Sequence, residues 1–401
     1  MAAPRLRLAG GLTAAAVYAV VALFAGLDRI SESDPAVASA IPWPFRINAV
    51  RAIATQAIAE NRPAEAIAYA RTAVSRDPAN VEAVAVLGQG QLLANRQADA
   101  LATYTVAREL GWREPSTQIF WMLDALGRKD FVQAGQRLDA VLRQAPKFAQ
   151  RDAMLAMFEG WPDGRDQIAR RLALNPSWKR AYFQDLAALQ PTTLYLRGEV
   201  ARSLARYDGE NRDCTLVAPL VWEMPQKLGY AEAHDVWRDY CQGGKTVSAV
   251  ADPGFENVRL ARPITPFDWR FPERGEIEVI AAPESGFSGT TLTVSSTAPG
   301  RRSFGKQLVR LAPGSYRASW RALDSDRKPS ADITLSVSCT ADAHDPVPAR
   351  VAEAEKGLHV ADFAVPGGCE TQWLDIAIAG QGGPVTLDDV RIDSAAPRPP
   401  R

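Results

Sequence analysis

The chain has 401 residues, of which 47% are hydrophobic, so it is long enough for two or three domains with cores of their own. Acidic and basic residues balance at 46 each, which gives a formal net charge of zero. This balance, and the lack of any long Lys/Arg block in the sequence, exclude a strong general attraction to nucleic acid or to anionic lipid.

An uncharged stretch near the N-terminus, LAGGLTAAAVYAVVALFAGL, runs from Leu8 to Leu27. At ~1.5 Å per residue, a helix of this length spans the roughly 30 Å hydrocarbon core of a bilayer. Arg5 and Arg7 precede it and acidic residues follow it. The positive-inside rule therefore predicts a single-pass inner-membrane protein with a cytoplasmic N-terminus and a periplasmic body. We expect the cytoplasmic tip and anchor over residues 1–30 and a linker over 31–46.

A cleaved signal peptide is the alternative, because Ala38-Ser39-Ala40 has the small residues found before a cleavage site. Against it, the apolar stretch is longer than the roughly 7–15 residues of a signal peptide. Charged residues also separate the stretch from Ala38. We favour the retained anchor, and both interpretations export the body of the chain.

The four cysteines all lie in the C-terminal half, and four cysteines allow three pairings. The nearest-neighbour pairs, Cys214 with Cys241 and Cys339 with Cys369, fall within separate segments. Each pair would close a loop of about thirty residues, for which the chain-entropy model gives roughly 3–4 kcal/mol of stabilisation. A zinc site is the alternative, but the sequence has no C-x-x-C spacing and its three histidines are scattered. We therefore favour disulfides.

Residues 47–180 repeat with a period of 34. Ala66, Ala100 and Ala134 lie 34 residues apart, and further small or apolar residues align on this period. The aligned sets include Ala70, Tyr104 and Leu138; Ala73, Ala107 and Val141; and Ile53, Leu87 and Trp121. The pattern resembles the tetratricopeptide repeat, whose small residues let the two helices of a hairpin approach each other. Residues 181–245 keep helical spacing and are predicted to extend or cap the array.

Tetratricopeptide repeats bind protein segments in a groove lined by the first helix of each hairpin, so the resemblance implies a protein partner. The residues expected in this groove are mostly polar, with apolar residues between them. They are Asn48, Arg51, Thr55, Glu82, Gln89 and Ser116, together with Ala85, Leu92, Ile119 and Leu123. The alternative is that some of them only pack against the helices that follow.

The helical spacing ends near Lys245, and seven later stretches alternate polar with apolar residues. These stretches are 275–282, 290–296, 303–311, 314–322, 332–340, 371–379 and 385–393. Turns containing Gly or Pro separate most of them. The pattern predicts an antiparallel β-sandwich over 246–393, followed by a disordered tail over 394–401. The expected fold is thus a transmembrane helix, an α-helical repeat array and a β-sandwich, in that order.

The predicted sandwich opens with DPGFEN at Asp252, continues with PFDWRF and closes with VTLDDVRI. These motifs resemble those of carbohydrate-binding modules of the jelly-roll type. The resemblance implies a jelly roll, a glycan ligand and a structural Ca²⁺ held by Glu256 and Asp388. Two carboxylates are too few for Ca²⁺, so backbone carbonyls would have to complete its shell. The alternative is a solvated or hydrogen-bonded pair at the edge of the sandwich.

A sugar site needs flat aromatic faces beside hydrogen-bonding groups. The candidates in the predicted strands are Tyr316, Trp320 and Trp373, whereas Phe255 and Trp269 are expected in the core. The alternative is that the candidates are buried as well, because the face of the sheet on which each one lies decides its role.

Catalysis has little support in the sequence, because no nucleophile or metal motif accompanies the histidines and no Gly-rich phosphate loop occurs. We expect a non-enzymatic binding or scaffold protein of the bacterial cell envelope, with no cofactor apart from the implied Ca²⁺. One hypothesis is a role in polysaccharide synthesis or export, in which the array docks a protein and the sandwich touches glycan. The other is a purely structural adaptor that binds only proteins. Exposed aromatic residues on one sheet face would favour the first.

Overall fold

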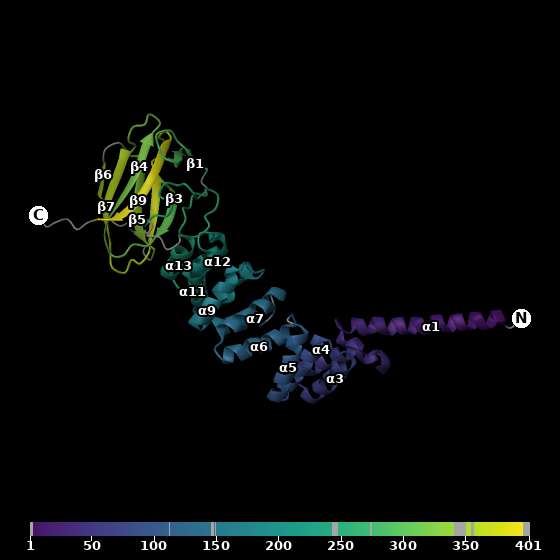
Figure 1. The fold of residues 1–401 in the computed structure, drawn as a ribbon. Coiled ribbons are helices and arrows are strands. Elements are labelled where there is room, and N and C mark those ends of the chain that lie inside the picture. The colour runs from purple at the N-terminus through teal and green to yellow at the C-terminus, as the bar shows by residue number, and fades with distance from the viewer. Residues whose placement is uncertain are drawn as a thin grey trace. The chain divides into compact units, whose positions relative to one another are not determined.

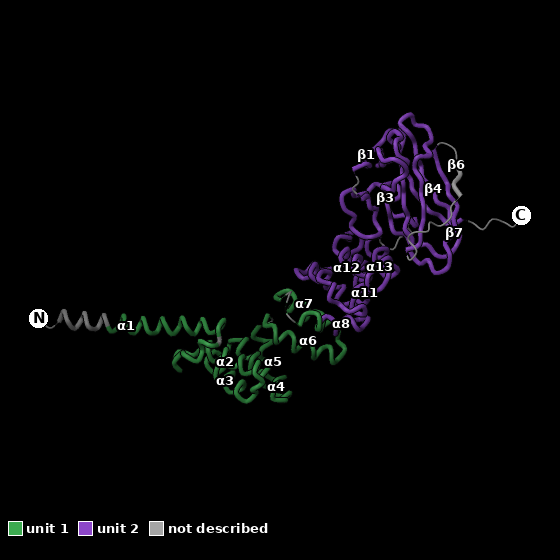
Figure 2. Tube along the Cα trace, turned by 180° about the vertical axis from the view of Figure 1, so that it is seen from behind, with its two compact units in different colours: residues 1–154 green, residues 155–401 purple. Residues whose placement is uncertain are grey.

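The structure is a computed structural model that describes residues 3–111, 113–145, 148, 150–242, 248–272, 275–340, 350–353 and 357–395. The chain divides into two compact units, Met1–Met154 and Leu155–Arg401 (Figure 2). Helices form the first unit and the start of the second, and antiparallel strands form the rest (Figure 1). The predicted fold class, helices followed by a β-sandwich, is therefore confirmed.

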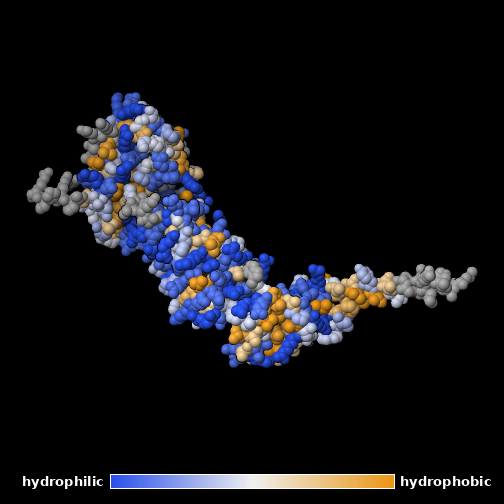
Figure 3. All heavy atoms as spheres, viewed as in Figure 1, coloured by the Kyte–Doolittle hydropathy of each residue, from blue (hydrophilic) through white to orange (hydrophobic). Residues whose placement is uncertain are grey.

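The first unit begins with helix α1, Ala3–Ile30. Its stretch Thr13–Ile30 is apolar and long enough to cross a membrane. Hydrophobic side chains such as Val20 and Leu23 are exposed along it (Figure 3). By length and composition, this helix could therefore span a bilayer or form part of a signal sequence.

The last turn of α1 packs on the first helix of the repeat array, α2 (Asn48–Ala59). Asp28 is only 4% exposed. Its carboxylate accepts hydrogen bonds from the backbone N–H groups of Ile47 at 3.0 Å and of Asn48 and Ala49 at 2.9 Å each. These donors have no partner inside a helix, because they lie at or just before the first turn of α2. Asp28 thus caps α2 from a distance of some twenty residues along the chain.

Three helix hairpins follow, and each one is a single 34-residue repeat. They are α2 with α3 (Pro63–Arg76), α4 (Val81–Leu93) with α5 (Gln97–Leu110), and α6 (Pro115–Gly127) with α7 (Phe131–Gln144). Ala66, Ala100 and Ala134 are all fully buried, as the repeat predicts. Gly88 is needed for close approach, because a Cβ there would lie 2.8 Å from the Tyr104 ring. Trp112 and Pro146, at the predicted ends of two repeats, lie outside the described residues.

The turns inside the three hairpins share one backbone conformation. Asn61, Asn95 and Lys129 lie 34 residues apart, and their φ angles are 57°, 58° and 59°. In each turn the next residue donates its N–H to a carbonyl five residues earlier, at 2.8 Å, as Arg96 does to Gln91. This left-handed residue followed by a six-residue hydrogen-bonded loop is the Schellman ending of a helix.

The second unit begins with a group of helices. The division between the units falls within helix α8 (Arg151–Glu159). The later helices are α9 (Pro162–Ala173), α10 (Lys179–Tyr182), η3 (Leu186–Ala188), α11 (Pro191–Asp208), α12 (Cys214–Lys227), α13 (Tyr230–Val236) and η4 (Trp237–Cys241). A disulfide joins Cys214 to Cys241, as predicted, and so ties the start of α12 to the end of η4.

Two antiparallel sheets form the sandwich. Their strands are β1 (Ile277–Pro283), β2 (Thr290–Ser296), β3 (Arg302–Val309), β4 (Gly314–Asp324), β5 (Ile333–Cys339), β6 (Arg350–Glu353), β7 (Leu358–Val365), β8 (Gln372–Ile378) and β9 (Val385–Ser394). One sheet has the order β1-β2-β9-β4-β7-β6 and the other β3-β8-β5. Strands β6 and β7 are additional to the seven predicted ones. Strand β9 includes Ser394, the first residue of the predicted tail, and residues 396–401 lie outside the described residues.

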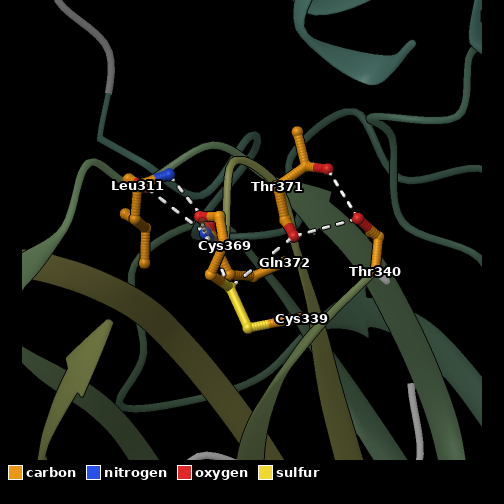
Figure 4. Close-up of a disulfide and its surroundings, with 6 residues drawn as sticks. All are labelled: Leu311, Cys339, Thr340, Cys369, Thr371 and Gln372. Carbon is orange, nitrogen blue, oxygen red and sulfur yellow. Dashed lines mark hydrogen bonds between the residues drawn. A yellow bond between two sulfur atoms is a disulfide. The ribbon is translucent and has the colours of Figure 1, made fainter. Parts of the chain in front are cut away.

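The second predicted disulfide, Cys339–Cys369, ties β5 to the loop before β8. The buried side chain of Gln372 lies beside it (Figure 4). Its Oε1 accepts a hydrogen bond from the Leu311 N–H at 2.9 Å, and its Nε2 donates to the Cys369 carbonyl at 2.6 Å. This glutamine satisfies backbone groups that the sheet itself does not pair, so the disulfide loop has a fixed place on the sandwich.

Helices α12 and α13 pack on the sandwich within the second unit. The rings of His234 and Trp237 contact the buried Phe267 at 5.2 and 5.3 Å between centroids. Arg310 forms a 2.8 Å ion pair with Asp235 of α13. The boundary predicted at residue 245 therefore separates two parts that lie in one compact unit.

Candidate binding sites

The outer face of the sheet β3-β8-β5 carries a row of polar side chains with one tryptophan beside it. In strand β8, Trp373 and Asp375 alternate with buried residues and are half-buried. Lys306 of β3 and Ser336 of β5 lie directly opposite Asp375 on either side. Arg270 extends the row, because its backbone forms two hydrogen bonds with Lys306, at 2.8 and 2.9 Å. Directly opposite residues share a face, so this row lies next to Trp373.

The Arg270 guanidinium lies over two indole rings, at distances typical of cation–π contacts. Its central carbon is 4.6 Å from the ring centroid of Trp222 and 5.3 Å from that of Trp373. Trp222 belongs to α12 and is 38% exposed, and its Nε1 donates a 2.8 Å hydrogen bond to the Ile264 carbonyl. The helix and the sheet therefore each supply one aromatic ring to the same cation.

These side chains line a groove of about 460 Å³ in the second unit. Its walls are mostly apolar, and the lining residues are Trp222, Pro263, Arg270, Phe271, Pro272, Lys306 and Trp373. Lys306 is neutralised by Asp375, with 2.9 Å between the ammonium and the carboxylate. Sites for small ligands have this character, with apolar walls and a few fixed polar groups.

Trp320 was predicted to contact glycan, and this prediction is wrong. Trp320 is fully buried in the core, where its ring stacks on His359 with 5.5 Å between centroids. In β4 the inward positions include Ala318 and Trp320, whereas Arg317 is exposed on the opposite face. A ring surrounded by core residues cannot stack on a sugar.

Tyr316 is also separated from the groove. It lies in β4 of the six-stranded sheet, whereas Trp373 lies in the three-stranded sheet. Its ring stacks on Phe363 with 5.9 Å between centroids, and its hydroxyl donates to the Ala312 carbonyl at 2.8 Å. The structure therefore brings only Trp373, of the three predicted aromatic contacts, to the groove.

Glu256 and Asp388 lie close together, as the resemblance to carbohydrate-binding modules implies. A Cβ added to Gly254 would lie 3.8 Å from a carboxylate oxygen of each. Burial raises the pKa of Asp388 to about 6, and the negative charges of Asp389 and Glu256 raise it as well. Asp388 is buried and Glu256 is exposed, and an acidic pair of this kind fits a cation. The described residues hold no cluster of three or more His, Cys, Asp or Glu around it, so backbone carbonyls would have to supply the other ligands.

The predicted groove residues of the array come together in pairs across the first helices of the hairpins. Arg51 of α2 reaches Glu82 of α4 at 3.8 Å, and Gln89 of α4 is hydrogen-bonded to Ser116 of α6. Thr55, Glu82, Leu92 and Leu123 are exposed, and Asn48, Gln89, Ser116 and Ile119 are partly exposed. Ala85 is only 1% exposed, so its prediction as a groove residue is wrong. It packs instead in the cluster that includes Tyr104 and Trp121.

Trp222 and Arg270 were not predicted as site residues. Arg270 had a usable signal, because it follows Trp269, which was expected in the core, and neighbouring residues of an extended chain point to opposite faces. Trp222 had none, because nothing in its helical segment indicates that it packs over the edge of a sheet about fifty residues later.

Residues 41–124 match the family model described as bacterial transcriptional activator domain. The match lies within the first unit and covers the first two hairpins and most of α6. No curated protein matches the chain.

Several solved structures are similar to the sandwich, at low scores. TmCBM61 in complex with β-1,4-galactotriose is 17% identical, with a TM-score of 0.26, and the match covers 37% of this chain and all of that one. The Clostridium thermocellum xylanase 10B modules CBM22-1–GH10, complexed with xylohexaose, are 16% identical over 38% of this chain and 29% of theirs, with a TM-score of 0.26. The bacteriophage CBA120 tailspike protein 4 active domain is 11% identical over 37% of this chain and 22% of its own, with a TM-score of 0.27. Scores this low assign neither a ligand nor an activity to this chain.

Proposed function

We propose that this chain is a membrane-anchored, exported binding protein of the bacterial cell envelope, without catalysis of its own. Its β-sandwich binds a glycan in the groove between Trp222 and Trp373, and its helical array binds a protein segment. The observation that carries the proposal is the groove itself, with two indole rings, a cation and apolar walls. A role in polysaccharide synthesis or export would use both binding functions together.

The anchor is retained in this proposal because the first repeat is built with it. Cleavage after Ala40 would remove Asp28, which supplies the side-chain cap of α2. It would also remove Leu27 and the fully buried Ala38, which pack with Ile41. The other first helices of the hairpins have local caps, such as Asn80 for α4, but no local side chain caps α2. The mature chain would therefore begin with an uncapped helix and an opened core.

N-terminal sequencing and intact mass of the protein extracted from membranes test this point. We expect the apolar stretch Leu8–Leu27 to be present in the mature chain. Protease added to spheroplasts should digest the body, since Arg5 and Arg7 hold the N-terminus in the cytoplasm. A mature N-terminus at Ile41, or a body protected from protease, would contradict the anchor or its orientation.

Oligosaccharide-array binding by the full-length protein in detergent tests the glycan function. Trp222→Ala and Trp373→Ala should each lower the affinity roughly ten- to thirty-fold, because an exposed aromatic contact contributes about 1–2 kcal/mol. Trp43→Ala is the matched control, since Trp43 is 60% exposed in the first unit. If wild type binds no glycan at all, the alternative hypothesis, an adaptor that binds only proteins, is favoured.

The protein partner of the array would lie along Thr55, Glu82 and Gln89, a mildly polar to apolar surface suited to an amphipathic segment. Crosslinking from a photoreactive residue placed at position 55 in living cells should capture it. The same residue placed at the exposed position 106, on α5, serves as the control. Equal capture from both positions would count against a specific groove.

We further propose that Glu256 and Asp388 hold a structural Ca²⁺, with backbone carbonyls as the other ligands. Addition of Ca²⁺ should raise the melting temperature of the wild type and leave that of Asp388→Asn unchanged. The same small shift in both proteins would indicate a pair without a metal.

A further inference from the structure

Arg270 is a cation without an anionic partner among the described residues. Its guanidinium forms no hydrogen bond and no ion pair there, and its Nε is buried without any hydrogen-bond partner. Other arginines of this unit are paired, as Arg310 is with Asp235 and Arg317 is with Asp362. The carboxylate of Asp268 acts on Arg270 only through space, because it already accepts hydrogen bonds from the backbone and hydroxyl of Thr265.

The Arg270 guanidinium lies over the rings of Trp222 and Trp373. The face of an indole attracts a cation without pairing its N–H groups, so these donors stay available to a ligand. Because Nε is buried, the donors that reach the groove are those of Nη1 and Nη2. A planar edge with parallel N–H groups matches the two oxygens of a carboxylate.

Among the described residues that line the groove, Arg270 is the cation without an ion pair. Lys306 lines the same groove but is neutralised by Asp375, which also accepts a 2.9 Å hydrogen bond from the Ser303 hydroxyl. Burial lowers the pKa of Arg270, against the smaller opposing effects of Tyr230 and Asp268, so removal of water is the dominant effect on this cation. An anion that enters the groove would restore the lost solvation and meet preformed donors.

We propose that the groove binds an acidic glycan of the uronic acid class, whose carboxylate is held by Arg270. The inference rests on the proposed glycan function and adds its substrate class. A pyranose ring would lie against the exposed part of Trp373 or Trp222, and the carboxylate attached to that ring would reach the guanidinium edge. An acidic peptide could offer the same carboxylate, but its backbone would need hydrogen-bond partners that these mostly apolar walls do not offer. A sugar face needs only the rings.

The test uses matched pairs of oligosaccharides that differ only in charge. Oligomers of galacturonate, mannuronate and glucuronate are each compared with the same sample after its carboxyl groups have been reduced to alcohols. Calorimetry on the full-length protein in detergent should show that at least one acidic oligomer binds about ten-fold or more tightly than its reduced form, because a charged, bidentate contact is lost. The difference should shrink as salt is raised.

The variants assign the preference to one side chain. Arg270→Gln should bind the acidic and reduced forms equally, with an affinity near that of wild type for the reduced form. Arg270→Lys should keep only part of the preference, because it retains the charge but loses the planar edge. Arg317→Gln, which removes a paired arginine from the other sheet, should leave the preference unchanged. Thermal melts of every variant confirm that the fold is kept.

Four results would overturn the inference. If wild type binds the acidic and reduced forms equally, the proposed glycan function is kept but the uronic acid class is contradicted. A preference that survives in Arg270→Gln places the carboxylate elsewhere. If an acidic peptide binds as tightly as the best uronate oligomer, and its binding depends on Arg270, the groove binds a protein segment instead of a glycan. If no oligosaccharide binds, in either form, the proposed glycan function fails first and this inference fails with it.

Discussion

Lys129 occupies, in the third hairpin, the turn position that asparagine holds in the first two. All three residues are left-handed, a conformation that asparagine tolerates better than lysine does. We predict that Lys129→Asn raises the free energy of unfolding by about 0.5–1 kcal/mol, because it relieves local backbone strain. Urea unfolding of the full-length protein in detergent measures the change.

The control for this prediction is the reverse substitution in the second hairpin. Asn95→Lys should lower the free energy of unfolding by a similar amount, since Asn95 has the same φ within one degree. If neither substitution changes the urea midpoint, lysine and asparagine adopt the left-handed turn conformation equally well, and the prediction is wrong.

Trp320 and Trp373 should respond to truncation in opposite ways. Trp320→Ala removes a fully buried ring, so we expect it to cost roughly 3–5 kcal/mol of stability. Trp373→Ala removes a half-buried ring at the groove and should cost clearly less while weakening glycan binding. Thermal melts together with binding assays separate the two effects. A collapsed melt for Trp373→Ala would mean that its main role is packing.

These two tryptophans also mark how far the sequence could predict the site. Alternation within β4 and β8 was readable, but alternation leaves open which of the two faces meets the core. In β4 one face carries tyrosine, alanine and tryptophan and the other carries arginine and serine, and aromatic residues are typical both of a core and of a sugar site. The choice is made by the other sheet, through contacts between residues far apart in the chain. Arg317 and Trp320 could therefore be placed on opposite faces, but neither could be assigned to solvent.

At the scale of elements, local patterns were enough to predict the hairpins and most of the strands. The 34-residue period fixed three pairs of helices because each repeat buries the same alanine. Strand β7, Leu358–Val365, was missed although its burial alternates, since its inward positions include His359 and the small Ala361, which weaken the apolar pattern. Contacts between elements, such as that of Trp222 with Arg270, could not be predicted from the spacing of residues along the chain.

The cap that α1 supplies to α2 is a contact of this second kind, and it can be tested. Asp28→Ala removes the side-chain acceptor of three backbone N–H groups at the start of α2, of which that of Ile47 keeps the Phe45 carbonyl. We expect a loss of about 1–2 kcal/mol, at the upper end for a helix cap because three donors share one carboxylate. Amide hydrogen exchange of the full-length protein in detergent should rise in the first turn of α2 and in Ala38–Ile41.

Asp34→Ala is the matched control for the cap. The exposed side chain of Asp34 accepts a hydrogen bond from the Ala36 N–H, at the start of η1. Its loss should leave exchange in α2 unchanged. Unaltered exchange in Asp28→Ala would remove the structural argument for a retained anchor, even if the anchor proved to be retained for another reason.

At the scale of the second unit, two buried groups titrate in the same pH range with opposite effects on stability. Burial lowers the pKa of His234 to about 4, and the positive charges of Arg310 and Arg238 lower it too, against the opposing charges of Asp235 and Asp239. Its contribution to stability is therefore present above the unfolded pKa of about 6.5 and is lost as pH falls toward 4. Asp388, whose pKa is raised to about 6, behaves in the reverse way. Its contribution is present below about 4 and is lost as pH rises through 6.

The two contributions should nearly cancel in the wild type, so the variants should reveal them. With a chelator present, Asp388→Asn should lose stability as pH falls from 6.5 to 4, because His234 is then the only one of the two groups that still titrates. His234→Phe should gain stability relative to wild type as pH falls over the same interval. Protonation of Asp388 then stabilises the fold, and protonation of His234 no longer opposes it. Each difference is on the order of 2–3 kcal/mol, from pKa shifts of about two units. Urea unfolding at half-unit pH steps, followed by tryptophan fluorescence, measures the slopes. Parallel slopes in wild type and His234→Phe would mean that the imidazole is solvated, and that α13 does not hold it against Phe267 as the structure has it.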